Sequence, residues 1–418
     1  MDRKTFPTCV GVFGAHGGAP RCRFARSLRI GGATLVILSG ACLDTKASHE
    51  AAESSDYPEA RITYSAGADS SDEFAGAPLS SVLLRDGGAL MVDSRELSFR
   101  RVGADGQVLW RGGRQGSGPG EYLEISQVVE SDSGLIQIFD RASMRLTTLS
   151  KEGTFMSSTK IPWLSKRNLH VIDVVSNGEF LVLSRRPRIV VDAGPSVEAD
   201  MFDLSLVTTT GDTTKTIGEV HVGDAIFLSD SGVERAIPLV SGSTYAQRCG
   251  SAVRVYGGGK SQSIGFDGTA AALPQPAGLR EPLEGGLASL IEQQSRSLRD
   301  QKLRERLSAL VGGKSEAFQS KLVIPDRDGR LWLRALSRTS KGNYDAWDGD
   351  MKSDSLHVSS PRFFIDSNRG RLLAVVPESA ETLSSVEVLQ PSSSQAPVPV
   401  GENHGATHCA QAIRIPPP

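Results

Sequence analysis

The sequence is poor in the residues from which metal centres and nucleophilic sites are usually built. Aromatic residues make up 6% of the 418 residues, and the chain has 7 histidines and 5 cysteines. It contains no G-x-S-x-G, no H-E-x-x-H and no paired-carboxylate signature. The N-terminal apolar run, residues 30–38, is too short for a membrane-spanning helix, which needs about 20 apolar residues. The sequence therefore lacks the commonest hydrolase signatures, and its main information concerns the fold.

Paired glycine turns are what the sequence has instead. The first turn of each pair contains Gly88, Gly134, Gly178, Gly250 or Gly329, and the second contains Gly106, Gly153, Gly211, Gly268 or Gly370. The spacing within a pair is 18 residues in the first copy (88 to 106), 19 in the second and 18 in the fourth, and it widens to 33 and 41 in the third and fifth. Two hairpin turns at constant phase, repeated about every 45 to 60 residues, predict one four-stranded antiparallel sheet per repeat, which is typical of a β-propeller.

A glycine-rich segment, GRQGSGPGEY at residues 113–122, is the strongest local motif. A phosphate-binding loop would continue into Lys-Ser/Thr and a helix, whereas this segment runs into a predicted strand, so phosphate binding is excluded. We expect Gly116, Gly118 and Gly120 to supply positive φ angles in a link between repeats. Glu121 is expected to accept backbone hydrogen bonds in the same link.

This segment and the residues after it resemble a known family. GSGPGEY, then ISQVV, a turn, LIQIFDR and a second turn are similar to the NHL-type six-bladed β-propellers common among bacterial lipoproteins. DRDGRLWLR and FFIDSNRGRLL match the same repeat less tightly, and the resemblance covers most of residues 75–377. It implies an all-β fold, a six-bladed β-propeller. It implies no single function, because this fold is found in receptors, scaffolds and some enzymes.

We expect the propeller to occupy residues 59–390. The predicted strand at 60–66 precedes the first repeat and would complete the last sheet, so that the ring closes without exposed strand edges. One helical insertion at about 287–311 is predicted from its Leu, Gln and Arg content and from the Gly312-Gly313 stop that follows. The Pro/Ser-rich tail, 391–418, is predicted to be disordered.

The N-terminal residues predict export. Residues 1–41 combine a basic flank, a short apolar run and small residues, as a secretory signal peptide does. The segment ending at Cys42 resembles the lipobox of bacterial lipoproteins, in which the cysteine carries the lipid. Residues 42–58 are polar and predict a flexible tether. We therefore expect an exported protein anchored by lipid to the cell envelope, on the periplasmic or outer-membrane side, with no other membrane contact.

Charge and cysteine content narrow the range of partners. Without residues 1–41 the formal net charge changes from −2 to −7, because six basic residues and one acidic residue are removed. An acidic body is unsuited to nucleic acid, whose affinity comes mainly from phosphate neutralisation. Cys249 and Cys409 remain beside Cys42. In an oxidising compartment these two either form one disulfide or stay unpaired.

Candidate binding residues lie where the repeat is interrupted, since long connections are commonly functional. The interruptions are the segments 185–200 and 337–362 and the helix-bearing segment 276–320. The candidate residues in them are Arg185, Arg186, Arg188, Tyr344 and Trp347. The three arginines would form a basic spot on an acidic protein, and the two aromatic residues could line a binding surface.

His170 is the one histidine at a suitable position for a metal site. It precedes the inner strand of the third repeat, where the resemblance to NHL-type lyases and lactonases implies metal ligands around the axial channel. A lone histidine there is more often packed or solvated, so we expect no metal, no cofactor and no catalytic residue. The sequence thus favours a monomeric, non-catalytic binding or scaffold module for an envelope protein, a peptide or a glycan. The alternative is an NHL-type metal-dependent lyase or lactonase with its site in the axial channel.

Overall fold

The computed structural model describes residues 60–66, 74, 80–166, 169–175, 178–186, 195–230, 233–238, 240–241, 244–257, 261–275, 280–282, 301, 305, 307, 318–320, 322–334, 342–348, 351–358, 363–376, 385–391 and 409–415. All of them belong to one unit, residues 54–418. They form 29 strands and one short 3-10 helix, η1 (Pro162–Ser165). The described part of the chain is therefore almost entirely β-structure, as the sequence predicts.

The first three sheets follow the chain in hairpin order. The first contains β2 (Val82–Leu83), β3 (Ala89–Asp93), β4 (Ser98–Val102) and β5 (Val108–Gly112). The second contains β6 (Ile125–Glu130), β7 (Ile136–Asp140), β8 (Arg145–Leu149) and β9 (Phe155–Lys160). The third contains β10 (Leu169–Val174), β11 (Phe180–Arg185), β12 (Ser196–Val207), β13 (Thr213–Asp230) and β14 (Val233–Pro238).

Three further large sheets complete the set, and two of them take in a strand from a distant part of the chain. The fourth contains β16 (Thr244–Cys249), β17 (Ala252–Tyr256), β18 (Gln262–Gly265), β19 (Ala270–Ala272) and the C-terminal β29 (Ile413–Ile415). The fifth contains β22 (Leu322–Pro325), β23 (Leu331–Arg334), β24 (Gly342–Asp348) and β25 (Met351–Val358). The sixth contains β26 (Phe363–Asn368), β27 (Arg371–Val376), β28 (Ser385–Pro391) and the N-terminal β1 (Ala60–Ala66). The strands β15 (Val240–Ser241), β20 (Arg280–Pro282) and β21 (Phe318–Ser320) form a separate small sheet, in which β15 contacts β13 of the third sheet.

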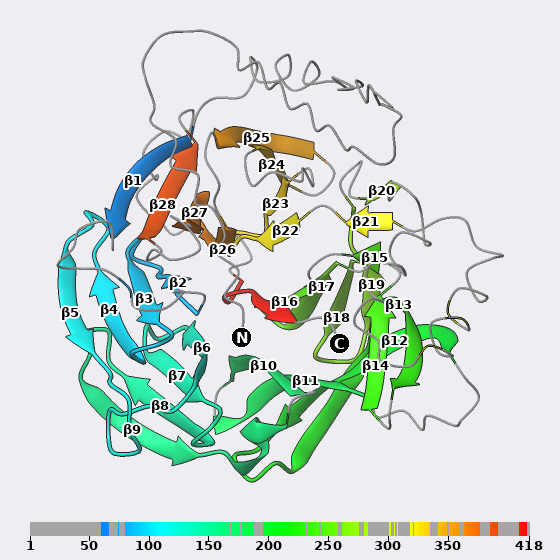
Figure 1. The fold of residues 1–418 in the computed structure, drawn as a ribbon, viewed down its shortest axis with the longest axis horizontal. Helices are drawn as coiled ribbons and strands as arrows, with labels where there is room; N and C mark the ends of the chain where they lie inside the picture. The colour runs from blue at the N-terminus through cyan, green and yellow to red at the C-terminus, as the bar shows by residue number, and fades with distance from the viewer. Residues whose placement is uncertain are drawn as a thin grey trace, which may run out of the picture. The chain divides into compact units, whose positions relative to one another are not determined.

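The first strands of the six large sheets bring neighbouring sheets into contact. β10 contacts β16, β16 contacts β22, β22 contacts β26, and β26 contacts β2. Side-chain hydrogen bonds connect the remaining neighbours, from Ser80 to Ile125 O and from Gln127 to Val171 O. The six sheets therefore follow one another in a closed cycle around a common centre (Figure 1). This arrangement is propeller-like.

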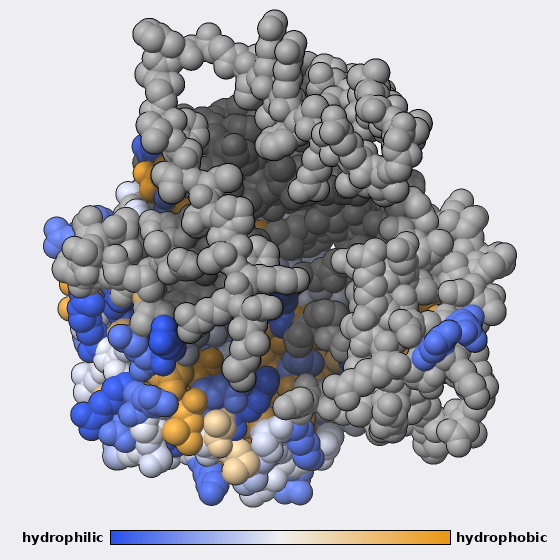
Figure 2. All heavy atoms as spheres, in the orientation of Figure 1, coloured by the Kyte–Doolittle hydropathy of each residue, from blue (hydrophilic) through white to orange (hydrophobic). Residues whose placement is uncertain are grey.

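The core lies between adjacent sheets. Leu90 of the first sheet and Ile138 of the second belong to one buried cluster, and Met91 of the first and Leu373 of the sixth belong to another. All residues of β3 and β7 are buried, whereas most of β9 is exposed. The second strand of each of these two sheets is thus core, and β9 forms an outer rim. Figure 2 shows hydrophilic residues around a small hydrophobic area on the face over the second sheet.

Two tryptophans cover glycines of the following sheet. Trp110 Nε1 donates to the carbonyl oxygen of Lys151 at 3.0 Å, and a Cβ added to Gly153 would lie 2.7 Å from the Trp110 ring. The same contact recurs one sheet later, where Trp163 covers Gly211 at 2.8 Å from the position of an added Cβ. Both glycines have positive φ, 83° and 100°. Glycine is therefore needed here for backbone conformation and for space.

The N-terminal strand behaves as the sequence predicts. β1 pairs antiparallel with β28, with Arg61 opposite Gln390 and Ala66 opposite Val386. It covers the outer edge of the sixth sheet, which would otherwise expose unpaired backbone groups.

Of two expectations about connecting segments, one is wrong and the other lies largely outside the described residues. The segment 337–362 is not a loop insertion, because it contains β24 and β25, which pair over their whole length. Asp348 pairs with Met351, so residues 349–350 connect the two strands. The predicted helix at 287–311 lies outside the described residues except for 301, 305 and 307, which have helical backbone.

Residues 409–415 of the tail are ordered, contrary to the disorder predicted for 391–418. β29 pairs antiparallel with β16, with Thr244 opposite Ile415 and Ala246 opposite Ile413. Cys409 forms a disulfide with Cys249, which resolves the two alternatives that the sequence leaves open. Burial of the apolar side chains of Ile413 and Ile415 in the core of the third and fourth sheets offsets the entropy cost of ordering this short segment.

Candidate functional site

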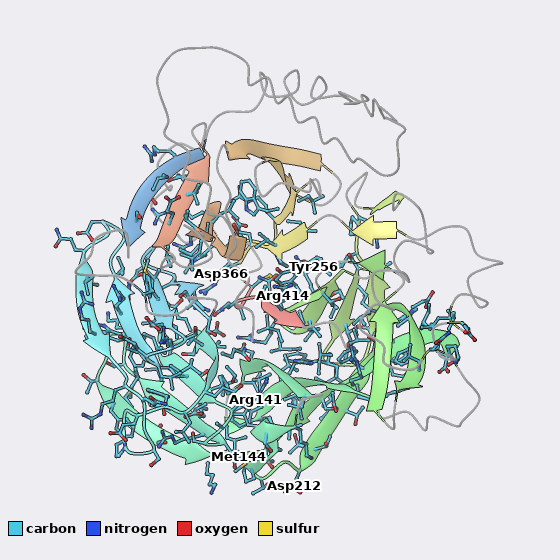
Figure 3. All side chains as sticks on the ribbon, viewed as in Figure 1. Arg141, Met144, Asp212, Tyr256, Asp366 and Arg414 are labelled. Carbon is cyan, nitrogen blue, oxygen red and sulfur yellow. A yellow bond between two sulfur atoms is a disulfide. The ribbon has the colours of Figure 1, made fainter. Side chains whose placement is uncertain are left out.

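Charged side chains gather where the first strand of each large sheet ends. In a meander of antiparallel strands the first and third turns lie at the same end of the sheet, so all turns of this kind share one side, which we call the turn face. The charged residues at the turn face form the axial cluster: Arg85, Glu130, Asp132, Asp173, Arg248, Asp326, Arg327 and Asp366. Figure 3 places Asp366 and Arg414 near the common centre and Met144 and Asp212 at the periphery.

An ion pair crosses the axial cluster from the fifth sheet to the second. Arg327 Nη1 donates to Glu130 Oε2 at 2.8 Å, and Arg327 Nη2 donates to the carbonyl oxygen of Leu83 at 2.6 Å. The side chains of Arg327 and Glu130 are only 4% and 9% exposed. Glu130 Oε2 also accepts a hydrogen bond from the backbone N–H of Arg85 at 2.8 Å. Three sheets are tied together at this point by buried, charge-assisted hydrogen bonds.

Two buried carboxyl groups bind the sixth sheet to its neighbours. Asp366 Oδ2 accepts from the backbone N–H of Leu83 at 2.8 Å and lies 4.0 Å from Arg327 Nη2. Burial raises the pKa of Asp366 to about 6, although Arg327 and the backbone donors oppose this rise. Asp326 accepts from Ser367 Oγ at 2.8 Å and from the Gly370 N–H at 2.7 Å, and burial together with nearby Asp328 raises its pKa. These groups hold backbone turns in place.

Arg248 joins the second, third and fourth sheets. Its Nη2 pairs with Asp132 Oδ2, and its Nε donates to Asp173 Oδ2. Burial opposes the ionisation of Asp132, but hydrogen bonds from Arg85 and Arg248 outweigh it and lower the pKa. Burial raises the pKa of Asp173 despite the neighbouring Arg248. The charges of this half of the cluster are thus paired with one another.

The C-terminal segment lies on the axial cluster. The backbone N–H of Cys409 donates to Arg327 O at 2.8 Å, and that of Ala410 donates to Arg248 O at 2.6 Å. Gln247 Nε2 donates to Ala410 O at 2.9 Å and to Asp326 O at 3.1 Å. β29 continues this segment along the edge of β16 that faces the common centre (Figure 1). The centre of the turn face is thereby covered by the protein's own chain.

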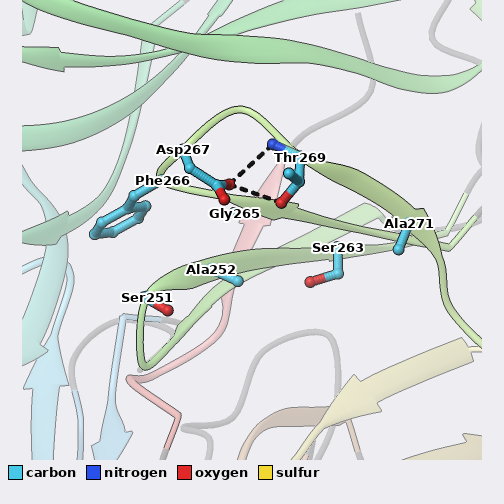
Figure 4. Close-up of a pocket in the computed structure, with 8 residues that line it drawn as sticks. All are labelled: Ser251, Ala252, Ser263, Gly265, Phe266, Asp267, Thr269 and Ala271. Carbon is cyan, nitrogen blue, oxygen red and sulfur yellow. Dashed lines mark hydrogen bonds between the residues drawn. The ribbon is translucent and has the colours of Figure 1, made fainter.

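A hollow opens beside this covered centre, and we call it the turn-face hollow. Its volume is about 450 Å³. It is lined by Ser131, Asp132, Ser133, Leu135, Gln137, Val174, Val175, Arg248 and Phe266. A second hollow of about 360 Å³ lies on the fourth sheet (Figure 4). There Asp267 accepts hydrogen bonds from Thr269, and the ring of Phe266 points away from the other lining residues (Figure 4).

The predicted metal candidate, His170, lies in β10 away from the turn-face hollow. Its ring is tilted against that of Phe202, with 6.2 Å between the ring centroids. Burial lowers the pKa of His170 to about 4, and the positive charges of Arg185 and Arg141 act in the same direction. Within the described ranges no group of three or more His, Cys, Asp or Glu residues is arranged to hold a metal ion.

The predicted basic spot is neutralised. Arg185 Nη2 pairs with Asp200 Oδ2 at 2.9 Å, and Arg186 pairs with Asp203 Oδ1 at 2.7 Å and with Glu219. The segment 185–200 is not wholly a loop, because β12 begins at Ser196 and pairs Phe202 with Arg185, which brings Asp200 and Asp203 close to the two arginines. A free anion would therefore compete with resident carboxylates. Arg188 lies outside the described residues.

The remaining predicted binding residues lie on another element. Tyr344 and Trp347 are in β24, paired with Arg334 and Leu331 of β23. Trp347 is near the end of a third strand and so belongs to the turn face, whereas Arg185 ends a second strand at the opposite end of its sheet. The predicted surface is therefore divided between two ends of the molecule's sheets. Cys42 lies outside the described residues.

The glycine-rich link has the predicted role with one change. Glu121 Oε2 accepts from the Gly118 N–H at 2.8 Å, and Glu121 Oε1 accepts from Arg114 Nε at 2.8 Å. Gly116 and Gly120 have positive φ, 151° and 71°, but Gly118 does not. At Gly118 an added Cβ would lie 3.0 Å from Glu121 Oε2, so the close approach of the carboxylate favours glycine there.

The axial cluster and the turn-face hollow were not predicted from the sequence. The signal was present, because charged residues stand directly before the turn glycines in several repeats, as in RDGG, SDSG and DRDG. Such residues are also common in turns for local reasons, so only the closed cycle of sheets shows that they meet.

Comparisons with known proteins give similarities of low identity. No protein-family model matches the chain, and no curated protein matches it. A solved structure of a protein described as exported, from Bacteroides fragilis, is 12% identical with a TM-score of 0.45, covering 80% of this chain and 95% of that one. A member of the DUF4221 family from Bacteroides vulgatus is 9% identical with a TM-score of 0.45, covering 80% and 98%. A streptogramin B lyase is 10% identical with a TM-score of 0.36, covering 76% and 96%.

Proposed function

We propose that this protein is an exported, six-bladed β-propeller, anchored by lipid at Cys42, that binds a component of the cell envelope at its turn face and catalyses no reaction. In this proposal the six large sheets are the blades, and β1 closes the ring. None of the described residues belongs to a helix with the length and apolar character needed to cross a membrane. The lipid at Cys42 would be the membrane attachment.

The main support for this proposal is that the charged side chains of the axial cluster are paired with one another. A catalytic site needs a nucleophile with its base, or ligands converging on a vacant position. Here Arg327 is bound to Glu130, and Arg248 to Asp132 and Asp173. The C-terminal segment also covers the centre where the resemblance places the sites of lyases and lactonases. This arrangement favours a rigid platform that presents a binding surface beside its centre.

A photo-crosslinking experiment tests the binding surface. A photoreactive amino acid at Ser133, which is exposed on the turn face, should form an adduct with an envelope component in intact cells. The matched control is the same residue at Arg95, which is exposed in the turn between β3 and β4 at the opposite end of its sheet. Equal adducts from both positions, or none from Ser133, would contradict the assignment of the turn face.

The lipid anchor and the absence of metal are tested separately. The Cys42→Ala variant should leave the membrane fraction, and the N-terminal peptide of the unmodified protein should carry acyl mass.

Elemental analysis of the purified folded protein should show less than stoichiometric Ca and Zn. Stoichiometric metal that is lost in a His170→Ala variant would favour the lyase or lactonase alternative instead.

A further inference from the structure

We propose that the turn-face hollow binds a neutral sugar, such as one residue of an envelope glycan. This inference rests on the proposed binding function and names its ligand. The hollow is built from the first turn of the second sheet, the end of β10 and the first and last turns of the fourth sheet. Its volume of about 450 Å³ lies within the ordinary range of small-molecule sites, about 300–1,000 Å³.

One buried side chain in the hollow has an unused hydrogen-bonding atom. Gln137 is 8% exposed and lies in β7 between Ile136 and Ile138, where every neighbour along the strand is also buried. In the part of the chain that the structure describes, its Oε1 has no hydrogen-bond partner. Leaving a buried acceptor unpaired costs about 1–3 kcal/mol. The oxygen itself is buried, so a ligand hydroxyl reaches it only when the Gln137 side chain turns toward the hollow, and the hydrogen bond formed then recovers this cost.

The charges around the hollow favour a neutral ligand. Asp132 and Arg248 line it, and each is already engaged, Asp132 with Arg85 and Arg248, and Arg248 with Asp132 and Asp173. An anion would meet the carboxylate of Asp132, and a cation would meet the guanidinium group of Arg248. Hydroxyl groups both donate and accept, so they can add to these paired groups without separating them. Arg248 Nη1, whose bond to Gly250 O is long at 3.5 Å, can donate to such a hydroxyl.

The other wall of the hollow is apolar. Leu135, Val174, Val175 and Phe266 are half-buried and line it. Phe266 also packs against the core of the third and fourth sheets, which holds its ring in place. A sugar ring presents C–H groups on its faces and hydroxyls at its edge, so it matches an apolar wall opposite amide, carboxylate and guanidinium groups. Burial of apolar ligand surface contributes roughly 25 cal/mol per Å².

The test uses the full chain in a detergent without a sugar headgroup. The probes are methyl glucoside, methyl galactoside and N-acetylglucosamine as neutral sugars, galacturonate as an anion and glucosamine as a cation. Saturation-transfer NMR and calorimetry should show that at least one neutral probe binds. It should bind about tenfold or more tighter than its charged counterpart, which is galacturonate for the galactoside and glucosamine for the other two sugars. A tenfold ratio is a difference of about 1.4 kcal/mol.

Two variants with matched controls locate the site. Gln137→Leu should weaken neutral-sugar binding by about tenfold or more while leaving the melting temperature equal or higher, because it removes an unpaired buried acceptor. Phe266→Ala should also weaken binding. The controls are Gln107→Leu and Phe155→Ala, at exposed positions outside the hollow, and both should bind as the unmodified protein does.

The outcomes separate this inference from the proposed function. If no sugar binds but the photoreactive residue at Ser133 still forms its adduct, the sugar inference is wrong and the binding function stands. Tighter binding of galacturonate or glucosamine, or unchanged binding by Gln137→Leu, would also overturn the inference. A lower melting temperature for Gln137→Leu with sugar binding intact would assign Gln137 a structural role. If neither sugar nor adduct is found, both proposals fail.

Discussion

Single glycines decide how closely neighbouring sheets can pack. Gly153 and Gly134 both stand in hairpin turns with positive φ, 83° and 78°. A Cβ at Gly153 would meet the Trp110 ring at 2.7 Å, whereas a Cβ at Gly134 would meet no atom within 4 Å. The two positions therefore share the backbone requirement and differ in packing.

We predict that Gly153→Ala is the more destabilising change. Gly134→Ala should cost about 1–2 kcal/mol, because alanine is disfavoured in the left-handed region. Gly153→Ala should cost about 1–3 kcal/mol more, because Trp110 must also move. Urea unfolding of the two variants measures this difference. Equal losses of stability would show that Trp110 yields without cost.

His170 makes the stability depend on pH in a defined direction. Its pKa in the folded protein is lowered to about 4 from an ordinary value of 6.5, mainly by burial. Between these values the unfolded chain binds the proton and the folded protein does not, so protonation favours unfolding. The contribution of His170 to stability is therefore present above pH 6.5 and is lost as the pH falls towards 4.

The His170→Gln variant tests this dependence. Its free energy of unfolding should fall less than that of the unmodified protein between pH 7 and pH 4.5, because glutamine does not titrate. Urea unfolding at several pH values gives both slopes, and their difference isolates His170 from the carboxyl groups that titrate in both proteins. Identical slopes would mean that the imidazole is more exposed than the structure shows.

At the scale of elements, the C-terminal strand depends on a covalent tie. β29 pairs over three residues, too few to hold a free segment in place. The Cys249–Cys409 disulfide joins positions 160 residues apart and fastens the segment to β16. We therefore infer that this bond keeps β29 ordered and holds the C-terminal segment on the axial cluster.

We predict that the double variant Cys249→Ser/Cys409→Ser is about 2–5 kcal/mol less stable to unfolding, the usual effect of removing a native disulfide. Amide exchange at residues 413–415 should also become faster. A reductant should destabilise the unmodified protein and leave the double variant unchanged, which is the internal control. Unchanged stability and exchange in the double variant would show that β29 is held by its packing alone.

At the scale of the whole molecule, the Arg327–Glu130 pair connects sheets that are not neighbours. Breaking a buried ion pair leaves an uncompensated charge, which typically costs 3–5 kcal/mol. Arg327→Met should therefore cost about that amount. Adding Glu130→Gln, which keeps an acceptor for the Arg85 N–H, should recover part of the loss.

A double-mutant cycle by urea unfolding measures this coupling, expected at about 1–3 kcal/mol. The exposed pair Lys151–Glu152, 78% and 63% exposed with 3.7 Å between Nζ and Oε1, provides the contrast. Lys151→Met should change stability by about 0.5 kcal/mol or less. Additive effects of the Arg327 and Glu130 changes would show that the pair does not couple the sheets.

The sequence by itself determined the repeating antiparallel sheets, because turn glycines and alternating strands act locally. It assigned Gly370 to the fifth repeat, whereas Gly370 lies in the turn between β26 and β27 of the sixth sheet. It also determined that the strand at 60–66 completes the last sheet, since an unpaired edge there is unfavourable. It missed β24 and β25, because the wide spacing between Gly329 and Gly370 indicated an insertion between them. It also missed β29, because three residues carry no periodic signal.

Only the tertiary structure decided which charges meet. Arg327 and Glu130 are 197 residues apart, and each has the character of an ordinary turn residue in the sequence. Their pairing depends on the closed cycle of sheets, which brings the ends of the first strands together at one face. The role of Gln137 also depends on the tertiary structure, because in the sequence it is only one polar residue in an apolar strand. Its unpaired oxygen and the hollow it lines exist only because turns from three separate sheets converge there.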